Sequence, residues 1–514
     1  MKVFNTTGLC NPNKHYMVDI MDKLEKIISL VKADKYFVIN RPRQYGKTTI
    51  LSALRRELLG RYLVISISFE GLGDIIFSDE QLFCQTFLKN CARAIRFIDR
   101  DNSNKLLKYY KEVTNLDNLS DYISEFIEEC NKEVILIIDE VDKSSNNQLF
   151  LNFLGLLRNK YLQREEGYDI TFKSVILAGV YDIKNLKLKL RPDEERKYNS
   201  PWNIAVPFDV DMSLSKEGIN NMLEDYKRDR GVDLDTERVS EFIYFYTNGY
   251  PFLVSRLCQI IDENLGACWN EEGMIRSVKL LLLERNTLFD DLVKNLENNK
   301  ELRYLIESIV IDGKIISYNL SNPIINLGVI FGILSNRDNK VSISNRIYEQ
   351  YIYDYLSSKT EVSNNGLGKY NFKSDFVEEN GLNIEKILLR FQQFMKEQYS
   401  SLDADFIERE GRLLFLAFIK PIINGVGFDF KEVQISEEKR LDVVIVYNAN
   451  KYIIELKIWR GEKYHQRGLK QLADYLDINE QEKGYLLIFN FNKDKEYKKE
   501  ELVVDGKYIV EVFV

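Results

Sequence analysis

The chain has 514 residues, of which 45% are hydrophobic and 29% charged. This length predicts several domains, and the composition is that of an ordinary folded protein with several cores. No apolar run is long enough to span a membrane, and the first residues lack the apolar core of a signal peptide. The six cysteines form no CxxC pair and there are only two histidines, which argues against disulfides, zinc fingers and His-rich metal sites. The sequence predicts a cytoplasmic protein with no membrane contact.

The net charge of −8 argues against a surface coated for nucleic-acid binding. It leaves a local basic groove open, because affinity for phosphates depends on where the charges lie.

The first part of the chain alternates short apolar, β-branched runs with helical segments, the pattern of an α/β fold with a parallel sheet. Strands are predicted at residues 35–40, 62–69, 133–139 and 174–180. Later segments are helical, then polar and rich in Asn, Gly and Ser, and then α/β again. The predicted domains are an α/β core at 1–212, a helical segment at 213–295, a winged-helix-like module at 296–356, a linker at 357–390 and a second α/β core at 391–514.

A phosphate-binding loop is predicted directly after the first strand. Gly46, Lys47 and Thr48 supply the second half of the GxxxxGK[ST] pattern, and a helix follows them. Backbone N–H groups and a Lys would hold the phosphates, and the Thr hydroxyl would contact Mg²⁺. Arg41 replaces the first Gly of the pattern, which leaves the shape of the loop open.

The second half of an ATP site is predicted at the end of the third strand. The run VILIIDE places Asp139 and Glu140 at the carboxyl end of this apolar strand. Asp139 would hold Mg²⁺ and Glu140 would polarise the attacking water. The alternative is a chance GKT sequence and acidic residues that cap a helix, but the two half-motifs together favour nucleotide binding.

A second constellation lies near the C-terminus, on two predicted strands joined by a turn. Asp442 begins the first strand, and Glu455 and Lys457 lie two residues apart on the second. Residues two apart on a strand share one face, and antiparallel pairing would bring Asp442 level with Glu455. Burying these charges in an apolar sheet is costly without a cation or partner. The set therefore predicts a divalent-metal site that cleaves phosphodiesters; a surface hairpin with alternating charges is the alternative.

The segments around residues 36–50 and 246–258, together with D-x₁₂-E-x-K near the C-terminus, resemble AAA-ATPase-like bacterial proteins that carry a C-terminal PD-(D/E)XK nuclease domain. In this family the loop likewise begins with Arg. The resemblance implies that residues 1–212 form a P-loop ATPase core, that residues 213–295 form its helical lid, and that residues 391–514 form a nuclease-like core of order αβββαβ. It also implies that the segment 15–20 lies near the adenine.

The resemblance also assigns roles to individual residues. Arg256 would sense the γ-phosphate, Glu410 would be the acid of the first nuclease helix with Glu408 as the alternative, and Gln471 would face the nuclease site. His465 is expected to be solvated. The predicted nucleotide-binding residues are Arg43, Gln44, Tyr45, Gly46, Lys47, Thr48, Thr49, Asp139 and Arg256; the catalytic ones are Glu140, Glu410, Asp442, Glu455, Lys457 and Gln471; the metal ligands are Thr48, Asp139, Glu410, Asp442 and Glu455.

The functional hypothesis is an ATP-binding and ATP-hydrolysing protein whose Mg²⁺-dependent nuclease domain acts on DNA under the control of the ATPase. Mn²⁺ is an alternative metal, RNA an alternative substrate, and a homo-oligomer is left open. The main alternative is an ATP-dependent switch that binds nucleic acid or a partner protein without cutting. A third hypothesis is an ATPase with a purely structural C-terminal domain.

Overall fold

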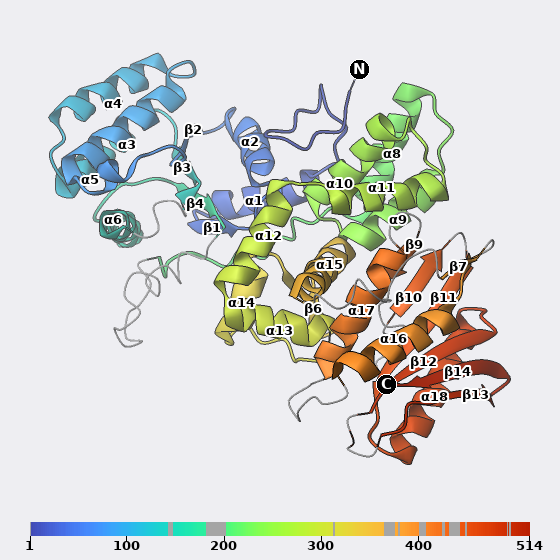
Figure 1. Ribbon diagram of the computed structural model, residues 1–514. Helices are drawn as coiled ribbons and strands as arrows, with labels where there is room; N and C mark the ends of the chain where they lie inside the picture. Colours follow the sequence, from blue (N-terminus) through green and yellow to red (C-terminus); the bar gives the residue numbers. More distant parts are fainter. Residues whose placement is uncertain are drawn as a thin grey trace. The chain divides into compact units, whose positions relative to one another are not determined.

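The computed structural model (Figure 1) describes residues 2–141, 147–180, 202–311, 314–363, 376–378, 381–399, 408–423, 427–430, 443–447, 450–490, 492 and 495–514. The chain forms two compact units. The first contains residues 1–295, 319–335 and 344–346, and the second contains 296–318, 336–343 and 347–514.

The first unit is built on a four-stranded parallel sheet. Its strands are β1 (Phe37–Asn40), β2 (Leu63–Ser68), β3 (Val134–Asp139) and β4 (Ser174–Gly179), in the order β1-β4-β3-β2. Val206 adds a single parallel bridge to Phe37, beside β1. The strands are apolar on both faces, as expected for a parallel sheet that is covered on both sides.

Helices cover both faces of this sheet. On one face, α1 (Met21–Lys32) and α2 (Lys47–Leu58) share a buried core with the sheet. On the other face, the core includes residues of four helices that lie together in Figure 1. These are α3 (Glu80–Ile95), α4 (Arg100–Glu112), α5 (Leu116–Glu128) and α6 (Gln148–Glu165), preceded by the short turn η1 (Asp74–Phe77).

A helical segment follows the sheet, as predicted from its 3.6-residue periodicity. Its core includes Phe4, Tyr16 and Val18 of the N-terminal segment, which therefore belongs to this layer. The helices are α8 (Lys216–Arg230), α9 (Thr236–Thr247), α10 (Pro251–Gln259) with the π-turn η4 (Ile260–Asn264), α11 (Glu271–Leu283) and α12 (Thr287–Asn298).

Next along the chain come helices and a hairpin, the element types expected of the winged-helix-like module. The order is α13 (Lys300–Val310), α14 (Pro323–Ile330), β5 (Leu334–Arg337), β6 (Lys340–Ile343) and α15 (Arg346–Ser363). Regular elements occupy both ends of the range predicted as a linker, because α15 runs to Ser363 and α16 begins at Ile384. The domain boundaries themselves stay a prediction.

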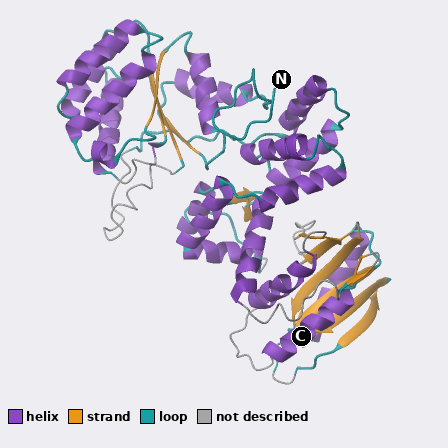
Figure 2. Ribbon diagram, turned by 45° about the horizontal axis from the view of Figure 1, so that its top comes forward, coloured by secondary structure: helices purple, strands orange, loops and turns teal. Residues whose placement is uncertain are grey.

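The C-terminal part of the second unit is a six-stranded mixed sheet, drawn in orange in Figure 2. The strand order is β13-β14-β12-β11-β10-β9. The strands are β9 (Gly427–Phe430), β10 (Val443–Tyr447), β11 (Asn450–Ile458), β12 (Lys483–Phe489), β13 (Lys499–Val504) and β14 (Lys507–Phe513), and the short pair β7 (Val377–Glu378) and β8 (Gly381–Leu382) lies apart from them in sequence.

Each face of the six-stranded sheet is covered by helices. Helix α18 (Glu462–Ile478) packs its apolar stripe on residues of β11, β12 and β14. Aromatic contacts join Phe391 of α16 (Ile384–Tyr399) to Phe489 of β12 and to Phe415 of α17 (Glu408–Ile423). Phe489 lies on the opposite side of its strand from Leu486 and Ile488, which contact the α18 core, so these helices cover the other face.

The predicted fold class is confirmed: a P-loop-type parallel sheet with helices, followed by a C-terminal α/β nuclease-like core. The β13–β14 hairpin was not predicted from the sequence. Among the described residues, no helix is both long and apolar enough to span a bilayer.

Candidate nucleotide and nuclease sites

The loop between β1 and α2 has the backbone shape of a phosphate cradle. Gln44 and Gly46 have positive φ angles of 56° and 81°. Helix α2 begins at Lys47, and its N-cap residue Gly46 offers no side-chain cap. The N–H groups of the first turn point along the helix axis toward the loop, and the positive end of the helix dipole favours an anion there.

Arg41, which stands where the usual pattern has its first Gly, fastens the base of this loop. Its guanidinium donates to the carbonyl oxygens of Asn40 and Val210 at 2.8 and 2.7 Å. It also lies 5.1 Å from the ring centre of Phe208. Burial lowers the pKa of Arg41, yet the group stays charged at neutral pH because an arginine starts so high. Arg41 thus links the phosphate loop to residues 208–210.

Lys47 is buried and held by backbone carbonyl groups. Its Nζ donates to the carbonyl oxygens of Arg41 and Pro42 at 2.8 and 2.9 Å. These acceptors are neutral, so they orient the ammonium group without cancelling its charge. A cation held in this way at the head of a helix suits the β- and γ-phosphates of a nucleotide.

The acidic half of the site lies at the end of β3. Asp139 Oδ2 is 3.4 Å from Thr48 Oγ1, which places two oxygen ligands suited to Mg²⁺ side by side. Glu140 follows with φ at 56°, a left-handed conformation that is strained for a residue with a Cβ. Its N–H donates to Asp139 Oδ1 at 2.9 Å. Glu140 lines a cavity beside the loop.

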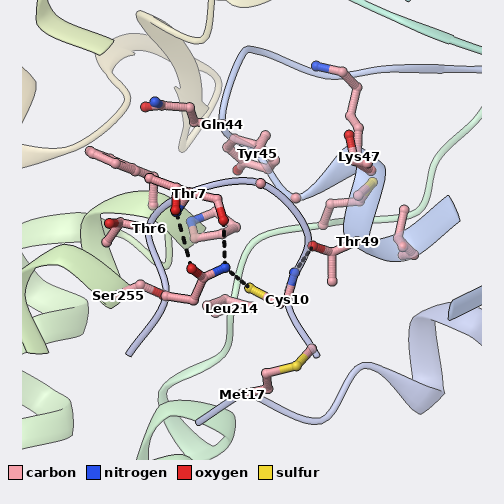
Figure 3. Close-up of a pocket in the computed structure, with 18 of the residues that line it drawn as sticks. Thr6, Thr7, Cys10, Met17, Gln44, Tyr45, Lys47, Thr49, Leu214 and Ser255 are labelled. Carbon is pink, nitrogen blue, oxygen red and sulfur yellow. Dashed lines mark hydrogen bonds between the residues drawn. The ribbon is translucent and has the colours of Figure 1, made fainter. Parts of the chain in front are cut away.

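The cavity that Thr48 and Glu140 line has a volume of about 580 Å³, a size typical of small-molecule sites. Asp139 is not among its described lining residues. Figure 3 shows Thr6, Thr7 and Cys10 of the N-terminal segment in the wall of this cavity, with Lys47 and Thr49 beside them. The backbone N–H of Cys10 donates to Thr49 Oγ1 at 3.3 Å and fixes this segment to α2. The predicted loop residues Arg43, Gln44, Tyr45, Gly46, Lys47, Thr48 and Thr49 all line it, together with Glu140.

The segment expected near the adenine also reaches this cavity. Tyr16, Met17, Val18 and Ile20 line it. His15 is not among the described lining residues; its Nδ1 accepts from the N–H of Asn11 at 2.9 Å, a local turn contact. Tyr45 packs edge-on against Tyr250, and burial raises the pKa of Tyr45 to about 12.

Arg256, predicted to sense the γ-phosphate, points elsewhere in this structure. Its Nε donates to Glu284 at 3.0 Å and its Nη1 donates to Gln259 at 2.6 Å. It is not among the described residues that line the cavity, whereas Ser255 and Phe252 of the same helix are. A sensing role would require the Arg256–Glu284 ion pair to open.

Two contacts join the phosphate loop to α12. Arg43 Nη1 lies 3.0 Å from Asp291 Oδ2, and Gln44 Nε2 lies 2.9 Å from Thr287 Oγ1. The hydroxyl of Tyr250 also donates to the carbonyl oxygen of Arg43. The loop therefore contacts the helical layer at several points, and a change in the shape of the loop would alter its contacts with α12.

The second candidate site lies on β11, where two charged side chains share one face of the sheet. Glu455 is 2% exposed, and Lys457 Nζ lies 2.8 Å from Glu455 Oε1. Glu455 is opposite Leu486 of β12, which belongs to the core under α18. A buried carboxylate in an apolar sheet is costly unless a cation compensates it. Here the Lys457 ammonium does so.

Only part of the predicted nuclease constellation lies among the described residues. Asp442 is outside them, and the ladder next to it ends with Val443 opposite Ile454. Helix α17 begins at Glu408 and includes Glu410, but the side chains of both acids are outside the described set. Gln471 is half-buried on α18. Among the side chains that the structure describes, no cluster of three His, Cys, Asp or Glu is arranged to hold a metal ion.

The expectation that His465 is solvated is wrong. Its side chain is 10% exposed, and Nε2 lies 2.7 Å from Oε1 of Glu511, which is fully buried. This hydrogen bond, opposed by burial, raises the pKa of His465. Trp459 and Phe513 pack around the ring. Sequence reasoning missed the pair because it did not predict β14; the run YIVEVF around Glu511, apolar on both sides of one acid, was the available signal.

Two family models match the chain. Residues 20–354 match the family described as AAA-like domain, and residues 424–500 match the PD-(D/E)XK nuclease superfamily. No curated protein matches the chain.

Solved structures with similar folds include a Walker-type ATPase of Pyrococcus abyssi, 13% identical over 68% of this chain and 99% of that one, with a TM-score of 0.48. The ORC2 protein of Aeropyrum pernix in its ADP form is 12% identical over 68% and 96% of the two chains, with a TM-score of 0.35. The ORC1 protein of the same organism in complex with DNA is 12% identical over 66% and 93%, with a TM-score of 0.31. At TM-scores below 0.5 these structures decide nothing about this chain.

Proposed function

The chain belongs to the AAA-like domain family, and from that premise we propose that it binds and hydrolyses ATP and uses a Mg²⁺-dependent C-terminal nuclease site to cut DNA under ATP control. The observation that supports the proposal is a group of charged and polar side chains suited to phosphate chemistry in each compact unit. The nucleotide set lies around Lys47, and the described part of the nuclease set is Glu455 with Lys457.

In the first unit, the chain's own residues suit phosphoryl transfer. The N–H groups at the start of α2 and the Lys47 ammonium would bind the β- and γ-phosphates. Thr48 and Asp139, 3.4 Å apart, supply oxygen ligands for Mg²⁺, which when bound would offset phosphate charge. Glu140, which lines the cavity beside the loop, would accept the proton of the attacking water.

In the second unit, Glu455 and Lys457 suit phosphodiester cleavage. Glu455 would be a metal ligand with Asp442 as its partner, and Gln471 of α18 would face the same site. Glu410 belongs to α17, which covers the face of the sheet opposite to Glu455, and it is therefore not part of this proposal. Mg²⁺ or Mn²⁺ when bound would lower the pKa of a water and polarise the phosphate. Lys457 would then be released from Glu455 to contact the water or the scissile phosphate. The described register, Val443 opposite Ile454, is the one that this arrangement requires.

The contacts of the phosphate loop with α12 support ATP control. Arg43 and Gln44 bind side chains in the first two turns of α12. The same helix ends with Leu296–Asn298, the residues at which the chain passes from the first compact unit to the second. A phosphate in the loop would compete with Asp291 for Arg43, and this competition would reach the second unit through α12.

The test is cleavage of supercoiled plasmid and of single-stranded DNA and RNA by the wild type and by Glu455→Gln. The expected result is metal-dependent cleavage of DNA by the wild type and a loss on the order of 10³-fold in the variant, because a ligand that stabilises the transition state by several kcal/mol is removed. ATP hydrolysis by Glu455→Gln should equal that of the wild type. Binding without metal-dependent cleavage by the wild type would instead favour the ATP-dependent switch.

A further inference from the structure

The solvent side of α18 carries a row of cations that the nucleotide and nuclease sites do not use. Lys463, Arg467 and Lys470 on this helix are all exposed. We call these three residues the α18 basic stripe. Within 457–470 there are five basic residues and one acid, Glu462, in a protein of net charge −8. The stripe is therefore a local reversal of the overall charge.

The stripe lies on the side of α18 that faces away from the sheet. Lys463, Arg467 and Lys470 are spaced four and three residues apart, which places them on one face of a helix. Leu469, Leu472 and Leu476, on another face, belong to the buried core. From Lys463 to Lys470 the helix rises about 10 Å, close to three nucleotide steps of about 3.4 Å along a B-form strand.

The cations of the helix lack protein counter-charges, whereas other lysines of the same unit have them. Lys463, Arg467 and Lys470 form no ion pair with any described residue. By contrast, Lys483 and Lys499 both bind Glu385, and Lys498 binds Glu500. The one acid at the start of α18, Glu462, accepts a hydrogen bond from Gln466. The stripe thus offers its charge to solvent or to an external anion.

Apart from Glu462 in the first turn, the charges along α18 run in the reverse of the order that stabilises a helix. Cations near the N-terminus oppose the helix dipole and acids near the C-terminus do the same. The stripe occupies the N-terminal half, Asp474 and Asp477 follow in the C-terminal half, and the last turn has no basic residue. Helix stability therefore does not explain the arrangement, while attraction of an anion does.

The helix that bears the stripe lies directly over the candidate nuclease residue Lys457. A Cβ atom at Gly468 would lie 3.6 Å from Lys457 Cε, an ordinary van der Waals distance, so the inner side of α18 passes close to the stem of Lys457. The stripe and the Glu455–Lys457 pair thus belong to the two sides of one helix.

We propose that the α18 basic stripe binds the phosphate backbone of the nucleic acid whose strand enters the Glu455–Lys457 site. The inference rests on the proposed nuclease function and adds to it the surface that receives the substrate. Such contacts read charge and spacing rather than bases, so the stripe contributes affinity without sequence preference. Tyr464, 41% exposed and 5.6 Å from the Arg460 guanidinium, adds an aromatic surface beside it.

The experiment measures binding of the full chain to a short labelled DNA duplex by fluorescence anisotropy, with metal removed by chelation, over a series of salt concentrations. The test variant is Lys463→Gln/Arg467→Gln/Lys470→Gln. The matched control, Lys483→Gln/Lys498→Gln/Lys499→Gln, removes the same charge from lysines that already have carboxylate partners. Thermal unfolding of both variants checks that they are folded.

The wild type should bind the duplex, and its affinity should fall as the salt concentration rises. The slope of log affinity against log salt concentration should be less steep by about 2 to 3 in the stripe variant, because each lost phosphate contact removes about 0.9 from the slope. The control should lose less than about one. Equal slopes in the wild type and the stripe variant would overturn the proposal. A wild type that does not bind the duplex at low salt would also overturn it. So would a stripe variant that binds the duplex as the wild type does and loses binding only to phosphatidylserine vesicles. This experiment measures binding and not cleavage, so it can fail independently of the cleavage assay. If the protein binds DNA through the stripe but does not cut it, the proposed nuclease function is contradicted while phosphate binding by the stripe is still supported.

Discussion

Two half-buried or buried lysines, Lys47 in the first unit and Lys457 in the second, are held in different ways. Lys47 donates to two neutral carbonyl oxygens, whereas Lys457 lies 2.8 Å from a buried carboxylate. The two carbonyl acceptors of the first ammonium carry no net charge, whereas the second ammonium is paired with a carboxylate. Under the proposed function, a metal ion would have to bind Glu455 before Lys457 could serve a substrate. The comparison therefore suggests that the proposed nuclease site needs its cation first, a requirement that the carbonyl groups around Lys47 do not impose.

Removal of each lysine gives the sharpest test of this contrast. Lys47→Ala should weaken ATP binding about 100-fold, since hydrogen bonds between an ammonium group and phosphate oxygens contribute about 1.5–3 kcal/mol each. Lys457→Ala should leave ATP affinity unchanged and abolish cleavage. Titration calorimetry measures the first effect and a plasmid assay the second. Wild-type ATP affinity in Lys47→Ala would refute the assignment of the loop.

Arg41 offers a second way to probe the nucleotide site. Arg41→Gly restores the usual first Gly of the motif but removes the bonds to Asn40 and Val210 and the contact with Phe208. We expect the free energy of unfolding to fall by about 1–3 kcal/mol with no gain in ATP affinity. Denaturant unfolding of the variant, with Arg43→Gly as the exposed control, measures the effect. A variant that is as stable as the wild type and binds ATP more tightly would show that Arg41 does not stabilise the loop and instead weakens nucleotide binding.

The smallest expected effect concerns the His465–Glu511 pair, which secures the first turn of α18. Because the hydrogen bond to Glu511 raises the pKa of His465, the protonated ring stabilises the fold. This contribution is full below the usual His pKa near 6.5 and is lost as the pH rises through the higher pKa of the folded state. As the pH rises from about 6.5 to the higher pKa of the folded state, the unfolding midpoint of the wild type should therefore fall by more than that of His465→Gln. Parallel pH profiles of the two unfolding midpoints would contradict this.

Much of both sites could be predicted from local sequence, because each motif lies at the end of an apolar strand. The sequence predicted β1, β3 and the GKT helix, and it predicted that Glu455 and Lys457 share a face. It did not predict that Arg256 binds Glu284 or that His465 binds Glu511. These partners are 28 and 46 residues away in sequence. Periodicity shows which face of an element is buried, but it does not show which distant side chain meets it.

The measurement that tests the central account most directly is the rate of DNA cleavage with and without ATP, for the wild type, Lys47→Ala and Glu140→Gln. ATP should change the wild-type rate by about 5-fold or more, the lower end of typical coupling between sites. Glu140→Gln should bind ATP without turnover and hold the ATP-bound rate, and Lys47→Ala should cut at one rate whether or not ATP is present. A wild type that binds ATP but cuts at the same rate with and without it would contradict the account.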